Sequence, residues 1–465
     1  MNRFRITKKL LPYFAFFFLF QIAKAQEIKP VFEGYKLMRS DENEDFWRKN
    51  KPTKPLLYQL KLIPLNPSRS INFTIGGQIR TRYEVFQNDT WSDNPKQDKG
   101  IYGHRLALHT GFQLGKHFRV FGELYHGFYG QKVFSQYEKL DLHQALAEFT
   151  LPLETTQLKL IAGRQEFNWG TGRIVSLREA LNMRRSFDGA RLISKSHRLK
   201  IEGFYALEVT PQFDPFNNSS RHAPKFWGLN FAFALPKKLG NLELYYYGYQ
   251  RINAKFQNAS GLETRHSLAF RASIENGKHF NHNSGIIYQF GSIDKSSISA
   301  WSFQSDMHYI WSEARYKPNL GLKLEYVTGD KNASDQQLNT FNPMFNNPSY
   351  FGLLNKMTSM NLKGIHPSFQ LSLKPTLRVK AEANFYWRAN KNDGLYAPSL
   401  ANIRAGKSTQ DSYIGTQLGA SFEWDLSKNF TFSNEFAYYV AGKYLEDSGG
   451  SENITYNVTT LNFRF

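Results

Sequence analysis

Hydrophobic and polar side chains alternate along most of the chain after residue 69. In the run that ends the chain, Leu461, Phe463 and Phe465 share one face because a strand has a period of two, and polar residues fill the other face. An aromatic edge strand of this kind would invite aggregation if it stayed unpaired. Pairing it with the first strand of the sheet removes the edge. The pattern therefore predicts a closed barrel of the outer-membrane type.

The same alternation recurs in about 18 runs, an even number as in single-chain bacterial barrels. The runs lie near residues 70–88, 101–115, 117–130, 142–152, 156–168, 186–196, 197–211, 223–236, 241–252, 262–276, 278–293, 297–317, 319–329, 357–374, 376–390, 409–425, 428–446 and 453–465. The sequence thus predicts an all-β fold, a transmembrane antiparallel β-barrel of about 18 strands over residues 69–465.

The connections between these runs have two sizes. Short ones alternate with long ones, which lie near residues 89–100, 168–185, 211–222, 330–356, 391–408 and 444–452. Short periplasmic turns and long extracellular loops are typical of outer-membrane barrels. Because long loops are commonly functional, we expect any gate or plug to come from the extracellular side.

Charged residues keep to one face of the runs. In the first run, Ile79 and Tyr83 share one face, whereas Arg80 and Arg82 share the other. An Arg or Lys that faced lipid at mid-depth would cost roughly 2–4 kcal/mol, so the charged face is expected to line the lumen. The same reasoning assigns further residues to the lumen: Glu84, Arg105, Arg119, Glu123, Arg378 and Arg388.

The beginning of the chain has the pattern of an export signal. Basic residues precede an apolar run over residues 10–22, and Ala23-Lys24-Ala25 offers the small residues that a signal peptidase reads. The run is shorter than the roughly 20 residues that a membrane-spanning helix needs. We expect a signal peptide over residues 1–25 and a periplasmic segment, rich in charge and proline, over residues 26–68.

Composition narrows the function classes. The chain has no Cys, which excludes disulfides and thiolate metal sites. Mean hydropathy is −0.51, so a helical membrane protein is excluded, whereas the 16% of aromatic residues fits the girdles of a barrel in outer-membrane lipid. Removing five basic residues with the signal lowers the net charge from +20 to +15. Nucleic-acid binding would need a concentrated basic face or a reading motif, and neither is visible.

The excess of basic residues has two interpretations. Lumenal arginines attract carboxylates, which they grip bidentately, and a ring of such charges selects anions. Alternatively, Arg–Glu pairs fill and stiffen the interior, and the excess charge lies on the loops. The first interpretation favours a pore with an anion preference.

Five stretches of the chain resemble the bacterial alginate export family. They cover residues 35–42 with 63–65, 76–84, 163–173, 329–352 and 393–415. The resemblance implies an 18-stranded barrel with an Arg-lined channel that passes an anionic polysaccharide outward, with periplasmic export components as partners. It also implies channel or constriction roles for Arg80, Arg82, Glu84, Arg164, Glu166 and Arg173. Gln78 departs from the family pattern, in which Glu is common, and the resemblance does not fix alginate as the substrate.

Arg164 conflicts with its own strand. It shares its parity with Leu158 and Leu160, so either the strand is bulged or the alternation fails there.

Two other functions remain as alternatives. One is a general or anion-preferring porin for small solutes. The other is an outer-membrane enzyme, although the metalloprotease, nucleophile-elbow and P-loop motifs are all missing and a catalytic triad would have to come from separate strands.

A polar stretch of the predicted loop 330–356 offers oxygen ligands suited to Ca²⁺, from Asp330, Asn332 and Asp335. An EF-hand would need Gly and Glu where the chain has Asp335 and Phe341. A solvated polar loop is therefore the alternative to a calcium site, and no other cofactor is expected.

Overall fold

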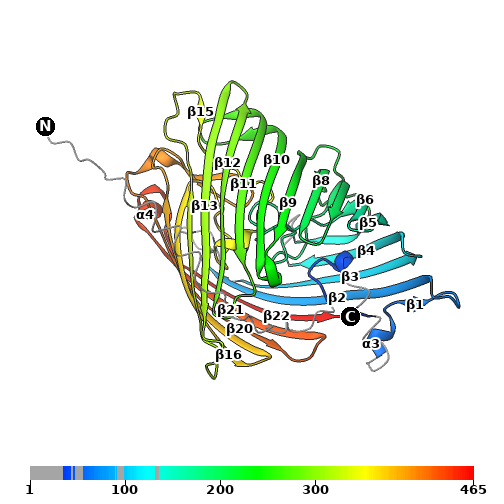
Figure 1. Ribbon diagram of the computed structural model, residues 1–465. Coiled ribbons are helices and arrows are strands. Elements are labelled where there is room, and N and C mark those ends of the chain that lie inside the picture. Colours follow the sequence, from blue (N-terminus) through cyan, green and yellow to red (C-terminus); the bar gives the residue numbers. More distant parts are fainter. Residues whose placement is uncertain (1–34, 43–45, 48–55, 90, 92–98, 131–135) are drawn as a thin grey trace.

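The structure is a computed structural model that describes residues 35–42, 46–47, 56–89, 91, 99–130 and 136–465 (Figure 1). The expected signal peptide and residues 26–34 lie outside this part of the chain. Within it, no helix is long and apolar enough to cross a membrane.

Eighteen strands of the described chain form one antiparallel barrel, as the alternation predicts. They are β2 (Ile71–Gln87), β3 (Lys99–Leu114), β4 (Phe118–Tyr129), β5 (Glu138–Pro152), β6 (Gln157–Gln165), β7 (Phe187–Lys195), β8 (Leu199–Glu208), β9 (Lys225–Ala234), β10 (Gly240–Lys255), β11 (Ser260–Ile274), β12 (Phe280–Ile293), β13 (Ser296–Ile310), β14 (Asn319–Val327), β16 (Leu362–Lys374), β17 (Leu377–Arg388), β20 (Tyr413–Asp425), β21 (Phe430–Ala441) and β22 (Ile454–Arg464). Each pairs with the next along the chain.

Smaller elements lie in the connections and the amino-terminal segment. They are η1 (Arg39–Asp41), α3 (Leu56–Gln59), β1 (Ile63–Pro64), η3 (Pro236–Lys238), β15 (Gln337–Leu338), η4 (Pro348–Phe351), β18 (Leu395–Tyr396), β19 (Asn402–Arg404), η5 (Gly406–Ser408) and α4 (Lys443–Ser448).

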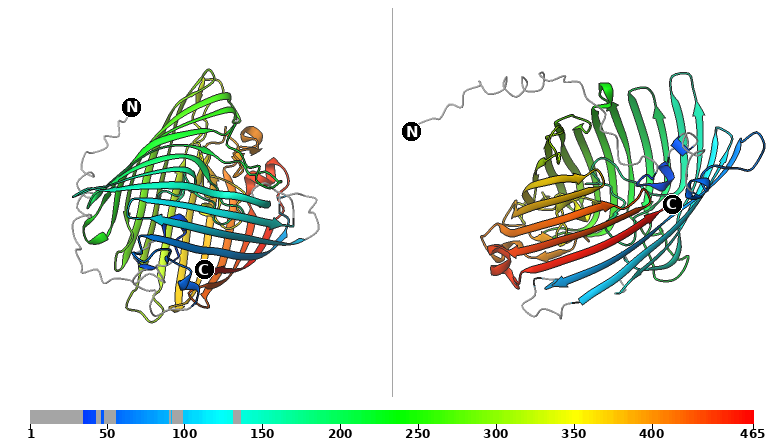
Figure 2. Two further views of the ribbon diagram at one scale, coloured as in Figure 1. Left: turned by 90° about the vertical axis from the view of Figure 1, so that its right-hand side faces the viewer. Right: turned by 90° about the horizontal axis from the view of Figure 1, so that it is seen from below.

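The barrel closes where β2 meets β22, which lie side by side in Figure 2. The register runs from Gln78 opposite Arg464 to Gln87 opposite Thr455. The aromatic final strand is therefore paired on both sides, because β21 flanks its other edge. This pairing leaves the aromatic final strand without an open edge that could aggregate, as the sequence predicts.

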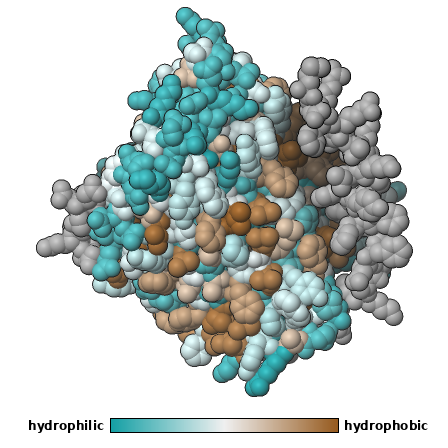
Figure 3. Space-filling model, turned by 90° about the vertical axis from the view of Figure 1, so that its left-hand side faces the viewer, coloured by the Kyte–Doolittle hydropathy of each residue, from teal (hydrophilic) through white to brown (hydrophobic). Residues whose placement is uncertain are grey.

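The two faces of the wall separate hydrophobic from polar side chains. Ile79, Leu108 and Leu244 are outward and 44%, 48% and 56% exposed, whereas Arg80 and Arg105 are inward and buried. Figure 3 shows part of the outer surface, where hydrophobic side chains gather below a hydrophilic upper region. The parity expected from the sequence is confirmed for these strands.

Connections also differ between the two ends of the barrel. One end has only short turns, of which the longest covers residues 311–318.

The other end carries the long loops, and two of them, residues 166–186 and 328–361, fold back into the lumen. Val175 and Phe345 of these loops bridge each other, and Phe345 packs edge-on against the wall residue Phe226 at 5.0 Å between ring centroids. A large hydrophobic cluster thus fills the upper lumen.

The described part of the amino-terminal segment lies at the end with the short turns. Tyr35, Trp47 and Tyr58 form a small aromatic cluster there. Arg39 and Lys61 donate hydrogen bonds to the main-chain oxygen of Phe465, at 2.8 and 3.4 Å. The segment is thereby attached to the last residue of the barrel, close to the closing strands (Figure 1).

Candidate functional site in the barrel lumen

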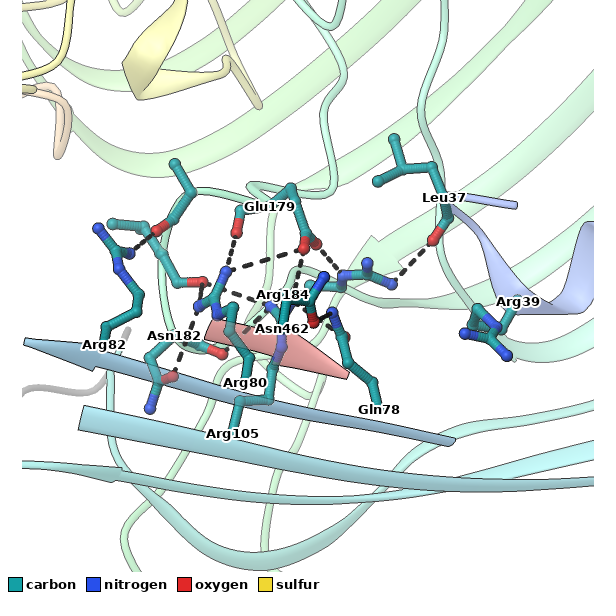
Figure 4. A network of polar contacts seen from close by, with 12 residues as sticks. Leu37, Arg39, Gln78, Arg80, Arg82, Arg105, Glu179, Asn182, Arg184 and Asn462 are labelled. Atoms are coloured by element: carbon teal, nitrogen blue, oxygen red, sulfur yellow. Dashed lines mark hydrogen bonds and ion pairs between the residues drawn. The ribbon is translucent and has the colours of Figure 1, made fainter. Parts of the chain in front are cut away.

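A cluster of arginines on β2 and β3 meets the loop of residues 166–186 at mid-height. Arg80 donates hydrogen bonds to the carbonyl oxygens of Glu179 and Leu181, both at 2.6 Å. Asn182 also lies beside this guanidinium group (Figure 4). Because alternate residues of a strand point the same way, Arg82 faces the lumen as well and donates to the carbonyl of Ala180. The wall arginines therefore bind the backbone of this loop.

Glu179 is the charged centre of the contact. Its carboxylate accepts from Arg105 Nη2 at 2.5 Å and from Arg184 Nε, and lies 3.7 Å from Arg80 Nη1 (Figure 4). Burial alone would raise the pKa of Glu179, but the guanidinium groups of Arg105, Arg184 and Arg80 hold that pKa well below its usual range. One carboxylate thus joins two wall arginines to an arginine of its own loop.

Polar partners surround the arginines on both sides. Arg82 is paired with Glu84 at 3.3 Å and donates to the Tyr456 hydroxyl at 3.2 Å. Tyr129 donates to the same Glu84 at 3.2 Å. Gln78 accepts a hydrogen bond from Arg105 at 3.1 Å. Residues of β2, β3, β4 and β22 therefore form one continuous polar surface toward the lumen.

Arg173 holds the same loop to the opposite wall. Its guanidinium group donates to Glu325 of β14 at 2.6 Å, and both side chains are buried. Ser359, from the other inserted loop, donates to the same carboxylate at 3.1 Å. Arg173 therefore anchors the loop over residues 166–186 to β14.

Arg164 does not face the lumen, and the expectation that it is a channel residue is corrected here. It lies on the same face of β6 as the lipid-facing Leu160. Its guanidinium group binds both oxygens of Asp188, at 2.8 and 3.2 Å, and the carbonyl of Asn218 at 3.3 Å. The bulge that could have turned it inward is absent, because β6 pairs regularly with β5 and β7.

A large basic cavity opens at the end with the short turns. Its volume is about 900 Å³, and Arg119 lies on its wall. Three acidic side chains line it, namely Asp41, Glu42 and Glu148, against seven basic ones. The basic residues are Arg69, Lys116, Arg119, Lys159, Arg191, Lys195 and Lys200. We call this cavity the basic vestibule.

Arg378 and Arg388 lie at opposite ends of the wall. Arg378 is paired with Glu423 and with Asp425, the latter at 2.9 Å, near the short turns. Arg388 is 1% exposed and donates to carbonyl groups of the loop over residues 389–412, including Gly406 at 2.6 Å. It organises an extracellular loop, and the hydrogen bonds of its guanidinium group go to this loop and not to the arginine cluster on β2 and β3.

Glu123 and Glu166 meet beside His143, and Arg184, which is paired with Glu179, lies 3.5 Å from Glu166. Glu166 follows β6 directly and lies 3.0 Å from His143 Nε2. Among the described residues, Glu123, His143 and Glu166 form the one group of three His, Asp or Glu side chains whose ligand atoms are close enough to share a metal ion.

The loop residues predicted to bind Ca²⁺ are separated by burial. Asp330 is buried and accepts from Asn258 at 2.7 Å. Asn332 and Asp335 are exposed and bind atoms of their own loop. Calcium binding here stays a prediction, and the geometry adds no support to it.

Sequence reasoning missed the loop half of this site. Glu179 and Arg184 of the loop were not among the predicted residues, although any gate or plug was expected from the long loops, which include residues 168–185. His143 of the wall strand β5 was missed as well. Strand parity carries no information about a loop, and no local motif marks Glu179.

The comparisons with known proteins fit this architecture. The sequence pattern of the alginate export family matches residues 71–458 of this chain. The chain belongs to the alginate export family. Among curated protein sequences none matches significantly.

Solved structures share the fold of this alginate export family member. Three are from Pseudomonas aeruginosa: OpdO (TM-score 0.55, 9% identity), OpdK with vanillate (0.54, 9%) and OccK2 (OpdF) in complex with glucuronate (0.54, 11%). Each match covers 84% of this chain and 97–98% of the other. The family and the barrel together identify an outer-membrane channel protein of bacteria. Neither the family description nor these structures points to an enzyme.

Proposed function

We propose that the protein is an export channel for an acidic, uronate-type polysaccharide. The observation that carries the proposal is the basic vestibule, in which seven basic side chains face three acidic ones. It lies at the end with the short turns, which is the periplasmic end of an outer-membrane barrel. An anionic polymer in the periplasm would therefore be concentrated at the mouth through which it leaves.

The vestibule would act on a polyuronate through its electric field and through the geometry of its side chains. A cavity with low-dielectric walls and an excess of one sign of charge focuses its field and raises the local concentration of the opposite charge. A polyuronate carries a carboxylate on each sugar, so several charges act on the same chain at once. Arg119 and Arg191 add planar guanidinium groups, which grip carboxylates bidentately. In this structure Arg119 is paired with Glu148 at 3.7 Å and Arg191 with Glu202 at 2.6 Å, so a polyuronate carboxylate would compete with these partners.

The arginine cluster at mid-height supplies the next set of sites. In the state described above, Arg80 and Arg82 are occupied by carbonyl oxygens of the loop over residues 166–186. These loop oxygens stand where carboxylate oxygens of a passing polymer would bind. We infer that the loop is a gate, and that its withdrawal exposes the arginines to the substrate. Periplasmic export components would then deliver the polymer to the vestibule.

Uptake of a small carboxylate is the second candidate. Its support is the filled upper lumen, which suits a single sugar acid better than a polymer while the loops stay in place. OccK2, which shares the fold at 11% identity, is solved with glucuronate, a monomeric uronate. Selectivity for anions is expected from both candidates, so polymer length is what separates them.

The test is planar-bilayer recording of the purified barrel. We expect reversal potentials that indicate anion preference, and current block by polyuronate chains at lower concentration than by monomeric glucuronate. An uncharged dextran of equal length serves as the control and should block weakly. Equal block by monomer and polymer would favour the small-solute porin, and a cation-preferring pore would contradict both candidates.

A further inference from the structure

Glu123, His143 and Glu166 bring three ligand atoms within 4.8 Å of one another in the interior. All three side chains are buried. An ion at the centre of such a group would lie at most about 2.8 Å from each atom, compared with Zn–ligand bonds of about 2.0–2.2 Å. Inward movements of less than about 1 Å would therefore complete the bonds.

The fold places these side chains by an irregularity in β5. Glu123 of β4 pairs with Gln144, whereas the next residue, Leu124, pairs with Leu142, so His143 is the extra residue of a bulge. A bulge redirects a side chain and is common beside functional sites. As a result His143 and Gln144 are both buried inward, while Leu142 faces outward.

Outer hydrogen bonds orient two of the ligands. Gln144 Nε2 donates to Glu123 Oε2 at 2.7 Å, and Gln144 Oε1 accepts from the backbone N–H of Glu166 at 3.3 Å. One amide thus positions both carboxylate residues. Support of this kind around metal ligands usually contributes 10- to 100-fold to affinity.

A second histidine points to a ligand independently. His109 of β3 is 1% exposed, and neither of its ring nitrogens has a hydrogen-bond partner. Its Nδ1 lies 3.9 Å from Glu123 Oε1, too far for a hydrogen bond. His109 lies outside the group whose ligand atoms are all within 4.8 Å of one another, so it joins a shared ion only after a larger movement than the other three residues. Buried polar atoms usually have a hydrogen-bond partner or a bound ion, so a ligand is expected at the ring nitrogens of His109.

The charges of the buried side chains also favour a bound cation here. Two buried carboxylates face each other here, and the nearest guanidinium group, that of Arg184, lies 3.5 Å from both oxygens of Glu166 and is bound more closely to Glu179. We propose that Glu123, His143 and Glu166 form a binding site for a divalent transition-metal ion such as Zn²⁺, with His109 as a fourth ligand. Imidazole ligands favour Zn²⁺ and its neighbours over Ca²⁺ or Mg²⁺.

The position of the site gives the ion a structural consequence. Glu166 is the first residue of the loop over residues 166–186, and the other ligands belong to the wall strands β3, β4 and β5. An ion bound there ties the root of the inserted loop to the wall. The site shares no residue with the basic vestibule, so the metal proposal and the polysaccharide proposal can be tested independently.

Zinc binding to the full-length barrel in detergent tests the proposal. The background should carry His126→Ala, because the ring nitrogens of His104 and His126 lie 3.1 Å apart and could take up Zn²⁺ themselves. After chelator treatment and dialysis, titration with ZnCl₂ should give one bound Zn²⁺ per chain. X-ray absorption should show N/O ligands at about 2.0–2.2 Å with imidazole among them.

Removing a ligand should weaken binding at least 100-fold. His143→Ala is the first variant, and His117→Ala, which changes a histidine beside a short turn, is the matched control. Folding is checked by the heat-dependent gel mobility of the barrel. If His143→Ala does not fold, the isosteric double variant Glu123→Gln with Glu166→Gln decides the matter. No zinc in the His126→Ala background, or the same affinity after loss of the ligands, would overturn the proposal.

Discussion

Replacing Glu179 by Gln should release the inserted loop from the arginines of the wall. The change keeps the size of the side chain and removes the charge that joins Arg105 to Arg184. Removing one partner of a buried ion pair costs roughly 3–5 kcal/mol, and exposed pairs contribute at most about 1 kcal/mol. Because the Glu179 side chain is 35% exposed, we expect a loss of about 2–3 kcal/mol. At 1.4 kcal/mol for each factor of ten, the undocked loop becomes roughly 30- to 140-fold more populated.

Single-channel recording measures this effect. We expect Glu179→Gln to open more often and to prefer anions more strongly, since the guanidinium groups keep their charge while their counter-ion is lost. Glu423→Gln is the matched control, because Arg378 retains Asp425 at 2.9 Å and no inserted loop is involved. A folded Glu179→Gln barrel with unchanged open probability and reversal potential would refute the gate.

Three further predictions follow from particular residues. The pKa of Glu179 is depressed while the loop is docked, so its carboxylate stabilises docking fully above the unperturbed pKa of about 4.3 and loses this effect only at lower pH. Acidification from pH 7 to about pH 4 should therefore not raise the open probability in bilayers. Arg388→Ala should leave buried carbonyl groups unpaired at a cost of roughly 1–3 kcal/mol each, and protease added to whole cells should then cleave residues 389–412. A single Cys in place of Leu108 should resist water-soluble thiol reagents, whereas one in place of Lys195 in the vestibule should react; equal labelling would contradict the assigned faces.

Strand periodicity explains what could be predicted from the sequence. Arg80 and Arg105 were placed correctly in the lumen because a period of two leaves one alternative face, and lipid excludes charge from it. The same rule, applied to Arg164, would have put it outside, where it lies, and the family resemblance was misleading at this residue. A local sequence pattern carries no information about a partner on a distant loop. Glu179 contacts residues some 70 to 100 positions away, and the bulge at His143 changes parity without any signal in the alternation.

Side-dependent block by polyuronate tests the export proposal most directly. Changing Arg119, Lys159, Lys195 and Lys200 to Gln leaves three basic side chains against three acidic ones in the vestibule. In bilayers with barrels of known orientation, the unmodified protein should be blocked at lower polyuronate concentration from the periplasmic side than from the extracellular side. The variant should lose that difference while remaining a folded, conducting pore. Equal block from both sides of the unmodified barrel, or a variant that keeps the difference, would contradict the proposed path.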